Sequence, residues 1–389
     1  MKQKVIIIIL FILLIISGVT IFVLLNNNNK KNSTDDNIEE NIKEESNDPT
    51  KPLNDKYWFF RSVGTMNVTK DEVANVTPTS INGTYRKNII KVLEQAKEVN
   101  ANYVEQNFDF TLNEDPKYLM PYYNIIPSLA RDYNLKVYFR LMPTKVLMDK
   151  IVNSQTDEEF EANSTEYFNL IEKLMFKENK IVKDDDIFST WTESDNEFTT
   201  KLGWETGTKR FKQYVKLASK FVKQMENKYN VNLIYTESIC GGEARLRDEI
   251  DLDVAKYIDF ISWDDYVGTT IENSSIENMK IESKAFVENV KYYSELYGLR
   301  IALGEWSTHW LTSKTKEEQS EYLTILTDDL NELSSSYFMG MEYFHFGLPS
   351  VVIDFSTASG YYSSPLFDKT GNFPAFNILK NVYANHAGN

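Results

Sequence analysis

Short β-rich segments alternate with longer helical segments from residue 56 to the end of this 389-residue chain. The predicted strands span residues 57–63, 103–108, 136–141, 187–192, 232–236, 260–263, 300–304 and 338–344. Eight strands that alternate with helical segments are typical of a closed (β/α)8 TIM barrel of the α/β class. A doubly wound open sheet is the alternative, but it usually carries a glycine-rich phosphate loop after an early strand, and the sequence has none.

The helical segments connect these strands. They are predicted at residues 84–99 and 117–133, in a long stretch after Pro143 that is clearest over 160–176, and at 208–229, 276–297, 316–333 and 375–383. Segment 208–229 has the clearest pattern, because its apolar residues recur along one helical face. Pro121 and Pro127 interrupt segment 117–133, since proline removes a backbone donor from a helix.

A long apolar run from Val5 to Leu25 follows Lys2 and Lys4. As a helix this run would reach roughly 31 Å, the thickness of the hydrocarbon core of a bilayer. We predict that residues 1–25 form an uncleaved signal-anchor, a single transmembrane helix with its basic end inside the cell. A cleaved signal peptide is the alternative, although no Ala-x-Ala cleavage site follows.

Residues 26–55 are polar, acidic and rich in asparagine, so they cannot bury enough apolar surface to fold. We predict a flexible linker there, and a barrel catalytic domain over residues 56–389. The barrel would stand on the extracytoplasmic side of the cell membrane, or be secreted if the N-terminal segment is cleaved. We expect this domain to be monomeric.

Composition excludes several classes of function. Lys and Arg number 42 against 57 Asp and Glu, a net charge of −15, which argues against nucleic-acid binding. Cys240 is the single cysteine of the chain, so an intramolecular disulfide and a zinc–cysteine cluster are both excluded. Aromatic residues make up 13% and suit both a core and a surface that stacks on sugars.

Carboxylates follow directly on several predicted strands. Glu193, Glu237, Asp264 and Glu305 each come at the carboxyl end of an apolar strand, where the active site of a TIM barrel lies. A carboxylate at such a position loses hydration unless it is paired or used in chemistry. The sequence therefore predicts an acidic site at this end of the barrel.

Two of these strand ends resemble motifs of the clan A glycoside hydrolases, a group of retaining barrel glycosidases. Segment 304–307, Gly-Glu-Trp-Ser, is similar to the motif that carries the nucleophile after strand 7. Segment 260–266 is similar to the strand 6 motif that supplies a tyrosine to the nucleophile, and segments 365–368 and 371–376 resemble the closing segment before the last helix. The strand 4 and strand 6 endings are most similar to the β-mannanase branches.

The resemblance implies the roles of three residues. Glu305 would be the nucleophile, Glu193 the general acid/base, and Tyr266 a hydrogen-bond donor that holds Glu305. The substrate would be a β-linked polysaccharide or oligosaccharide, with no cofactor and no metal. Two positions depart from the clan pattern: Thr192 replaces the asparagine that commonly precedes the acid/base, and Ser307 replaces a common glycine.

The chemistry needs two carboxyls whatever the family. The leaving oxygen must receive a proton while negative charge stands at the anomeric carbon, so one carboxyl is protonated and the other ionised. Two like charges close together raise the pKa of one of them. At roughly 5–5.5 Å apart, the ionised carboxyl attacks directly and configuration is retained.

Several alternatives stay open. Glu197, in an Asn-Glu pair, competes with Glu193 as the acid, and Glu237 could be a pocket carboxylate, a salt-bridge partner or the true acid. Other candidates to bind substrate are Tyr266, Trp191, Trp263, Trp306, Asp264, Arg140 and His345. Arg61, Glu105 and Arg140 lie on the first three strands and could pair for structure or bind sugar. His309 and His345 lack the short spacing typical of a metal pair, and Cys240 has no evident base.

Two other functions compete with the hydrolase. One is a catalytically silent barrel that binds glycan, which the altered motif at Thr192 would favour. The other is a metal-dependent barrel hydrolase that acts on cell-wall polymer.

Overall fold

The computed structural model describes residues 50–65, 83, 86–269, 275–308, 315–347, 366–368 and 371–388. The chain divides into two units, Met1–Asp48 and Pro49–Asn389, and all described residues belong to the second. The predicted signal-anchor and nearly all of the predicted linker lie outside the described residues. None of the described helices is long and apolar enough to cross a membrane.

Nine parallel strands form one sheet. They are β1 (Phe60–Thr65), β2 (Tyr103–Asp109), β3 (Lys136–Met142), β4 (Asp186–Ser189), β5 (Leu233–Tyr235), β6 (Ser238–Cys240), β7 (Ile261–Asp264), β8 (Ile301–Trp306) and β9 (Phe338–Gly347). Their order is β5-β4-β3-β2-β1-β9-β8-β7-β6. Thr236 and Glu237 alone separate β5 from β6 in the chain, so the two ends of this sheet meet there. The sheet therefore curls into the TIM barrel that the sequence predicted, with its fifth strand broken in two.

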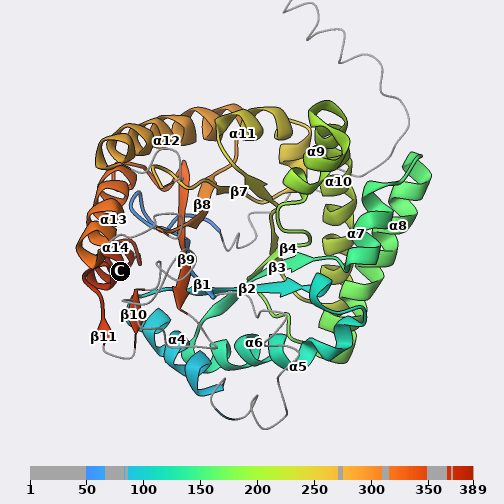
Figure 1. Cartoon of the computed structure of the whole chain (residues 1–389), viewed down its shortest axis with the longest axis horizontal. Helices are drawn as coiled ribbons and strands as arrows, with labels where there is room; N and C mark the ends of the chain where they lie inside the picture. The colour runs from blue at the N-terminus through green and yellow to red at the C-terminus, as the bar shows by residue number, and fades with distance from the viewer. Residues whose placement is uncertain are drawn as a thin grey trace, which may run out of the picture. The chain divides into compact units, whose positions relative to one another are not determined.

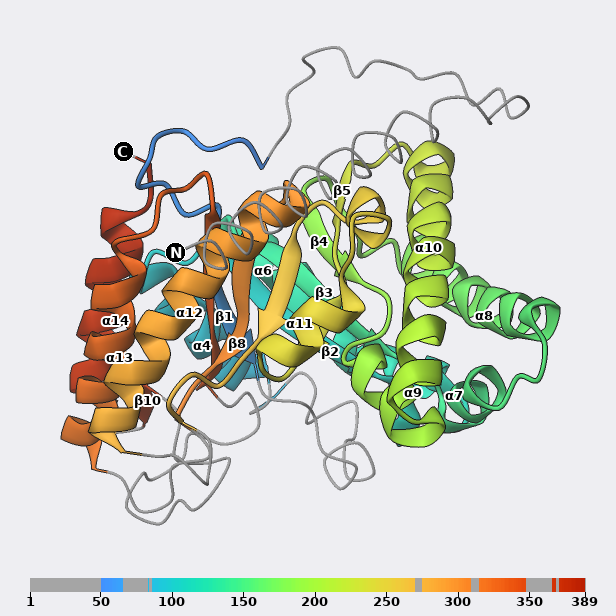
Figure 2. The same cartoon turned by 90° about the horizontal axis from the view of Figure 1, so that it is seen from above.

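Helices surround the strands (Figure 1). They are α4 (Arg86–Glu98), α5 (Met120–Tyr123), α6 (Ile125–Ala130), α7 (Lys145–Val152), α8 (Asp157–Ile171), α9 (Ser194–Leu202), α10 (Trp204–Tyr229), α11 (Glu243–Glu249), α12 (Ile276–Tyr297), α13 (Lys316–Leu330) and α14 (Pro374–Asn385). The view from above shows α10 running beside β4 and β5, with α8 beyond it (Figure 2). A π-helical turn, Glu172–Glu178, continues α8. The sequence predicted one long helical stretch after Pro143, where the structure has α7 and α8, but it did not predict the short helices α9 and α11.

The barrel interior changes in character along its axis. A layer near the amino ends of the strands is apolar and buried, and consists of Phe59, Phe60, Tyr103, Tyr138, Ile187, Ile234, Phe260, Ala302 and Met339. Buried polar side chains follow toward the carboxyl ends: Ser62, Glu105, Arg140, Ser189, Ser238, Ser262, Asp264, Glu305 and Glu342. The apolar layer closes one end, so the polar layers can serve the opposite end.

The two ends of the described chain meet at the amino side of the barrel. Trp58 stacks on His386 with ring centroids 4.0 Å apart, and its backbone N–H donates to the carbonyl of His386 at 3.0 Å. Residues 50–55, predicted as the end of the linker, contact the barrel, since Ser335 N–H donates to the carbonyl of Asp55 at 2.9 Å. Arg61 donates to the carbonyls of His386 and Asn100. Its role is therefore to join these ends.

Candidate active site

Glu305 lies on β8 with its side chain inside the barrel, and 4% of the residue is exposed. Arg140 forms an ion pair with its Oε1, and the hydroxyl of Tyr266 donates to its Oε2 at 2.6 Å. Gly304 precedes it because a side chain there would overlap its neighbours: a Cβ would lie 2.2 Å from Asp264 Oδ1 and 2.2 Å from Ser262 Oγ. Arg140 and Tyr266 thus both stabilise a negative charge on Glu305.

Arg140, on β3, is fully buried and bridges two carboxylates. Its Nη2 lies 2.7 Å from Asp264 Oδ2, while its Nη1 pairs with Glu305. Burial acts to lower the pKa of Arg140, but Asp264 and Glu305 beside it raise the pKa well above the usual value. The guanidinium therefore stays charged and orients both carboxylates.

Glu193 reaches the same space from the loop after β4. It stands at the N-cap of α9 with a left-handed backbone, φ +54°, which is uncommon for a residue other than glycine. Burial, and then the charge of Glu305, raise the pKa of Glu193 to about 7. Glu193 can therefore hold a proton near neutral pH, as a general acid must.

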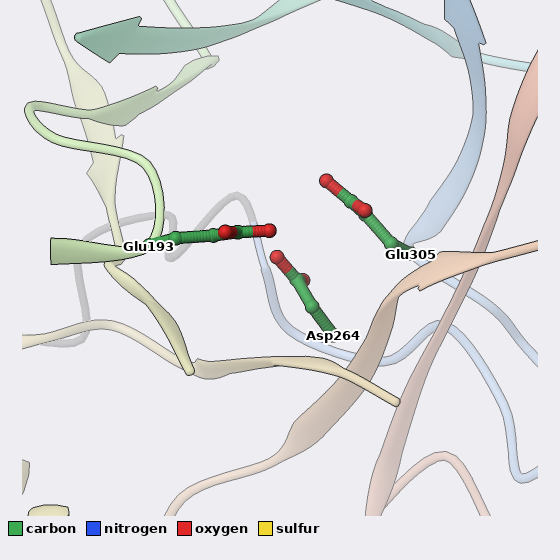
Figure 3. Close-up of side chains that lie close together, drawn as sticks. All are labelled: Glu193, Asp264 and Glu305. Atoms are coloured by element: carbon green, nitrogen blue, oxygen red, sulfur yellow. The ribbon is translucent and has the colours of Figure 1, made fainter. Parts of the chain in front are cut away.

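Three carboxyls converge in this space. Glu193, Asp264 and Glu305 point toward one another from three different elements (Figure 3). One oxygen of each lies within 4.8 Å of the corresponding oxygens of the other two. That separation is close to the roughly 5–5.5 Å typical of retaining glycosidases and shorter than the roughly 6.5–9.5 Å of inverting ones.

The spacing of these oxygens would also suit a divalent cation. Arg140, however, already places positive charge against both Asp264 and Glu305, so this cluster does not need a metal to balance its charge. We therefore assign no metal ligands.

The three tryptophans that were predicted to bind substrate are core residues instead. Trp191, Trp263 and Trp306 are at most 1% exposed. The ring of Trp263 packs on Phe286 of α12 with centroids 4.8 Å apart, and the ring of Trp306 packs on Tyr343. Successive residues of a strand point to opposite faces, so Trp263, next to the inward Asp264, points to the helices. A ring without an exposed face cannot stack on a sugar.

Glu237 was predicted as a pocket carboxylate, but it lies in the barrel wall between the end of β4 and the helix layer and is not a member of the carboxyl cluster. It accepts hydrogen bonds from Ser189 Oγ at 2.8 Å, from Thr190 N at 3.0 Å and from Tyr235 Oη at 3.0 Å. Thr190 in turn hydrogen-bonds Tyr214 of α10. Burial raises the pKa of Glu237 to about 7. This carboxyl joins the end of β4 to the helix layer.

The other candidates fall outside the carboxyl cluster or outside the described parts. Glu197 lies on α9, one turn beyond Glu193, and is not a member of the cluster. His345 belongs to β9, but its side chain is not described, and His309 lies outside the described residues. The Cys240 thiol is half-buried at the end of β6, close to Glu193, and acts to lower the pKa of that carboxyl.

Two further carboxyls lie deeper in the barrel. Glu105 on β2 and Glu342 on β9 are fully buried, and Ser62 Oγ donates to Glu342 at 2.9 Å. Burial raises the pKa of Glu105 to about 8, although Arg140 opposes the change. Burial and the charge of Glu105 raise the pKa of Glu342. Glu342 was not predicted from the sequence, although its place in the strand alternation would have predicted an inward side chain.

Comparisons with known proteins support the fold. No family model matches the chain, and no curated protein sequence matches it. A fungal β-1,4-galactanase superposes with a TM-score of 0.57 at 12% identity, over 83% of this chain and 99% of that one. A GH1 β-glucosidase from Exiguobacterium antarcticum B7 gives 0.55 at 10% identity, over 85% of this chain and 98% of the other.

A GH5-4 broad-specificity endoglucanase from an uncultured bacterium gives a TM-score of 0.53 at 10% identity, over 85% of this chain and 94% of the endoglucanase chain. Likeness at this level of identity concerns the fold. The fold is a (β/α)8 barrel like that of these three glycoside hydrolases, and it does not single out the β-mannanase branch.

Proposed function

We propose that this protein is a retaining glycoside hydrolase that cleaves β-linked glycans. The observation that carries the proposal is the approach of Glu193 and Glu305 within 4.8 Å, from the ends of two strands far apart in the sequence. Their surroundings differ in the way the reaction requires. Glu305 faces the donors Arg140 and Tyr266, while Glu193 has a pKa of about 7.

The reaction proceeds in two displacements. Glu305 attacks the anomeric carbon as the glycosidic bond breaks, and Glu193 gives its proton to the leaving oxygen. A covalent glycosyl ester on Glu305 results. Glu193, now ionised, takes a proton from water, and the water oxygen attacks the anomeric carbon and releases Glu305. Two inversions give net retention.

Arg140 and Tyr266 hold the attacking oxygen of Glu305 in place. Arg140 binds Oε1 and Tyr266 binds Oε2, so the carboxylate cannot rotate freely. Such fixed positions raise the reaction rate, because the reacting atoms start close to their attacking positions.

The test uses the full chain in detergent or in membranes, with a panel of β-1,4-galactan, β-1,4-glucan and β-mannan. Hydrolysis by the wild type, with the β-anomer as the first product by proton NMR, supports the proposal. Glu305→Gln should abolish hydrolysis and keep glycan binding, while Glu197→Gln on α9 serves as the control. Hydrolysis that continues unchanged in Glu305→Gln would remove Glu305 from the mechanism.

A glycan-binding barrel without activity is the second candidate, and Thr192 favours it. Thr192 has a hydroxyl in place of the amide that clan A members commonly have there, and this Oγ1 is buried with no hydrogen-bond partner among the described residues. Binding without hydrolysis by the wild type would favour this candidate. Loss of hydrolysis in a chelator would instead favour the metal-dependent hydrolase.

We also propose that residues 5–25 anchor the protein in the cell membrane with the barrel outside. The length and apolarity of this run and the two lysines before it support the proposal. Protein that stays in the membrane pellet after alkaline washing, and whose barrel is cut by protease added to intact cells, would agree with it. Release of a shortened chain into the medium would indicate cleavage instead.

A further inference from the structure

A second pair of carboxyls lies directly behind the proposed acid/base. Asp195 is in the first turn of α9, two residues after Glu193, and Glu249 is the last residue of α11. Both are fully buried, and Arg245 Nη1 lies within 4 Å of an oxygen of each, so the two carboxyls are close together. Two buried carboxylates repel each other, so this contact needs an explanation.

The partners of the pair show where a proton must be. Asp195 Oδ2 accepts from the backbone N–H of Cys240 at 2.9 Å, and Glu249 Oε1 accepts from Arg245 Nη1 at 3.2 Å. The other oxygens, Asp195 Oδ1 and Glu249 Oε2, have no N–H or O–H donor within the described ranges. Two acceptor oxygens can bond to each other when one of them carries a proton.

Arg245 decides which of the two is charged. Its Nη1 lies 3.2 Å from Glu249 but 3.9 Å from Asp195. Burial and the charge of Glu249 raise the pKa of Asp195 well above its usual value. The other charged groups that act on the pair are acidic: Glu193 and Asp264 favour a neutral Asp195, and Asp248 raises the pKa of Glu249.

We propose that Asp195 and Glu249 share one proton, carried by Asp195, and act as positioning residues for Glu193. This inference rests on the proposed function of Glu193. The pair joins the start of α9, next to Glu193, to the end of β6, because Asp195 Oδ2 accepts the backbone N–H of Cys240. It holds Glu193 in its left-handed backbone, and it does so without adding a negative charge beside the acid.

The first test is Asp195→Asn. An asparagine can copy the neutral carboxyl, since its amide donates to Glu249 while its carbonyl accepts from Cys240 N–H. We expect kcat/KM within about twofold of the wild type, and an alkaline limb of the pH profile at the same pH. Asp195→Ala removes both bonds. We expect a fall in kcat of about tenfold or more, with the alkaline limb at lower pH, because Glu193 becomes more hydrated.

A second measurement does not depend on finding the substrate. The infrared difference spectrum at pH 7 between the wild type and Asp195→Asn should lose the C=O band of one protonated carboxyl. Asp248→Asn on α11 is the matched control, because Arg247 lowers the pKa of Asp248 and this carboxyl is therefore ionised. Its difference spectrum should contain no such loss.

Two results would overturn the inference: Asp195→Asn as inactive as Asp195→Ala, or no lost band in the infrared spectrum. If the glycan panel shows no hydrolysis, the proposed function fails, while the infrared result still reports on the shared proton. If hydrolysis is found and the infrared difference spectrum shows no lost C=O band, the shared proton is disproved while the proposed hydrolase function stands.

Discussion

Glu305 and Glu237 occupy similar places in the sequence but opposite sides of the barrel wall. Each follows an apolar strand, and each is at most 4% exposed. Glu305 points into the barrel, where Arg140 and Tyr266 bind it. Glu237 points outward from the break between β5 and β6, where donors at the end of β4 surround it.

The two glutamates differ in whether groups of the protein itself account for all their neighbours. The groups that bind Glu237 all belong to residues 189–191 and Tyr235, so the fold itself satisfies this carboxyl. Glu305 instead faces two other carboxyls within 4.8 Å, which it cannot bond without a shared proton or a bound molecule. Glu237 therefore supports structure, whereas Glu305, which also faces the general acid Glu193, is placed for chemistry.

Loss of Glu305 should have the largest effect on activity. Glu305→Gln removes the attacking oxygen, so we expect kcat to fall by a factor on the order of 10³ or more, with substrate still bound. Initial rates and binding on the same glycan measure both quantities. A normal rate in Glu305→Gln would show that Glu305, like Glu237, is not needed for catalysis.

Loss of the general acid Glu193 should have the next largest effect on activity. Glu193→Gln cannot protonate the leaving oxygen, so kcat should fall about 10²–10⁴-fold. The wild type should lose activity above about pH 7, because the pKa of Glu193 is about 7 and the proton is then lost. The residual activity of Glu193→Gln should lack this alkaline limb. An unchanged limb would assign the acid to another group.

Secondary structure was the part that the sequence predicted well. The pattern over residues 276–297 predicted α12 with its observed bounds, because Ser275 caps its start and Gly298, at φ +68°, ends it. The strand alternation could also have placed Trp263 outward and Asp264 inward. These features depend on neighbouring residues, which the sequence contains directly.

The direction of strand-end residues was harder to predict. β4 ends at Ser189, three residues before its predicted end, and a loop with a left-handed residue then carries Glu193 inward. The break after Tyr235 turns Glu237 outward. Both depend on local backbone conformations that the residue types do not specify. The contact of Asp195 with Glu249 depends on how two separate helices pack, so no local pattern reveals it.

The next effect concerns the glycine beneath the nucleophile. In Gly304→Ala the new Cβ would overlap Asp264 Oδ1 and Ser262 Oγ, so the inner carboxyls must shift. Shifts of about 1 Å in such groups can cost on the order of 10²-fold in rate. Gly242→Ala is the matched control, because its Cβ would meet no atom within 4 Å and its φ is −72°. Equal rates in the two variants would contradict the crowding argument.

Loss of the outer glutamate should affect stability and leave activity near the wild-type level. Glu237→Gln cannot accept from all the donors at the end of β4, so the free energy of unfolding should fall by about 1–3 kcal/mol. Urea denaturation measures this change, and the glycan assay measures the rate. A large loss of activity at normal stability would place Glu237 in the mechanism after all.

The smallest effect is a pH dependence of the free energy of unfolding, to which the catalytic carboxyls and Glu237 both contribute. Glu105 has a pKa of about 8, and Glu193, Glu237 and Asp265 have pKa values of about 7, all above those of an unfolded chain. Between about pH 4.5 and 7 the folded state therefore binds more protons than the unfolded state, so stability falls as the pH rises. We expect the free energy of unfolding to be lower at pH 8 than at pH 5 by at least about 1 kcal/mol. Urea midpoints at the two pH values test this, and Glu237→Gln should flatten the dependence, because the outer group then no longer titrates. A midpoint that stays constant or rises with pH would mean that these carboxyls titrate in the folded protein as they do in the unfolded chain.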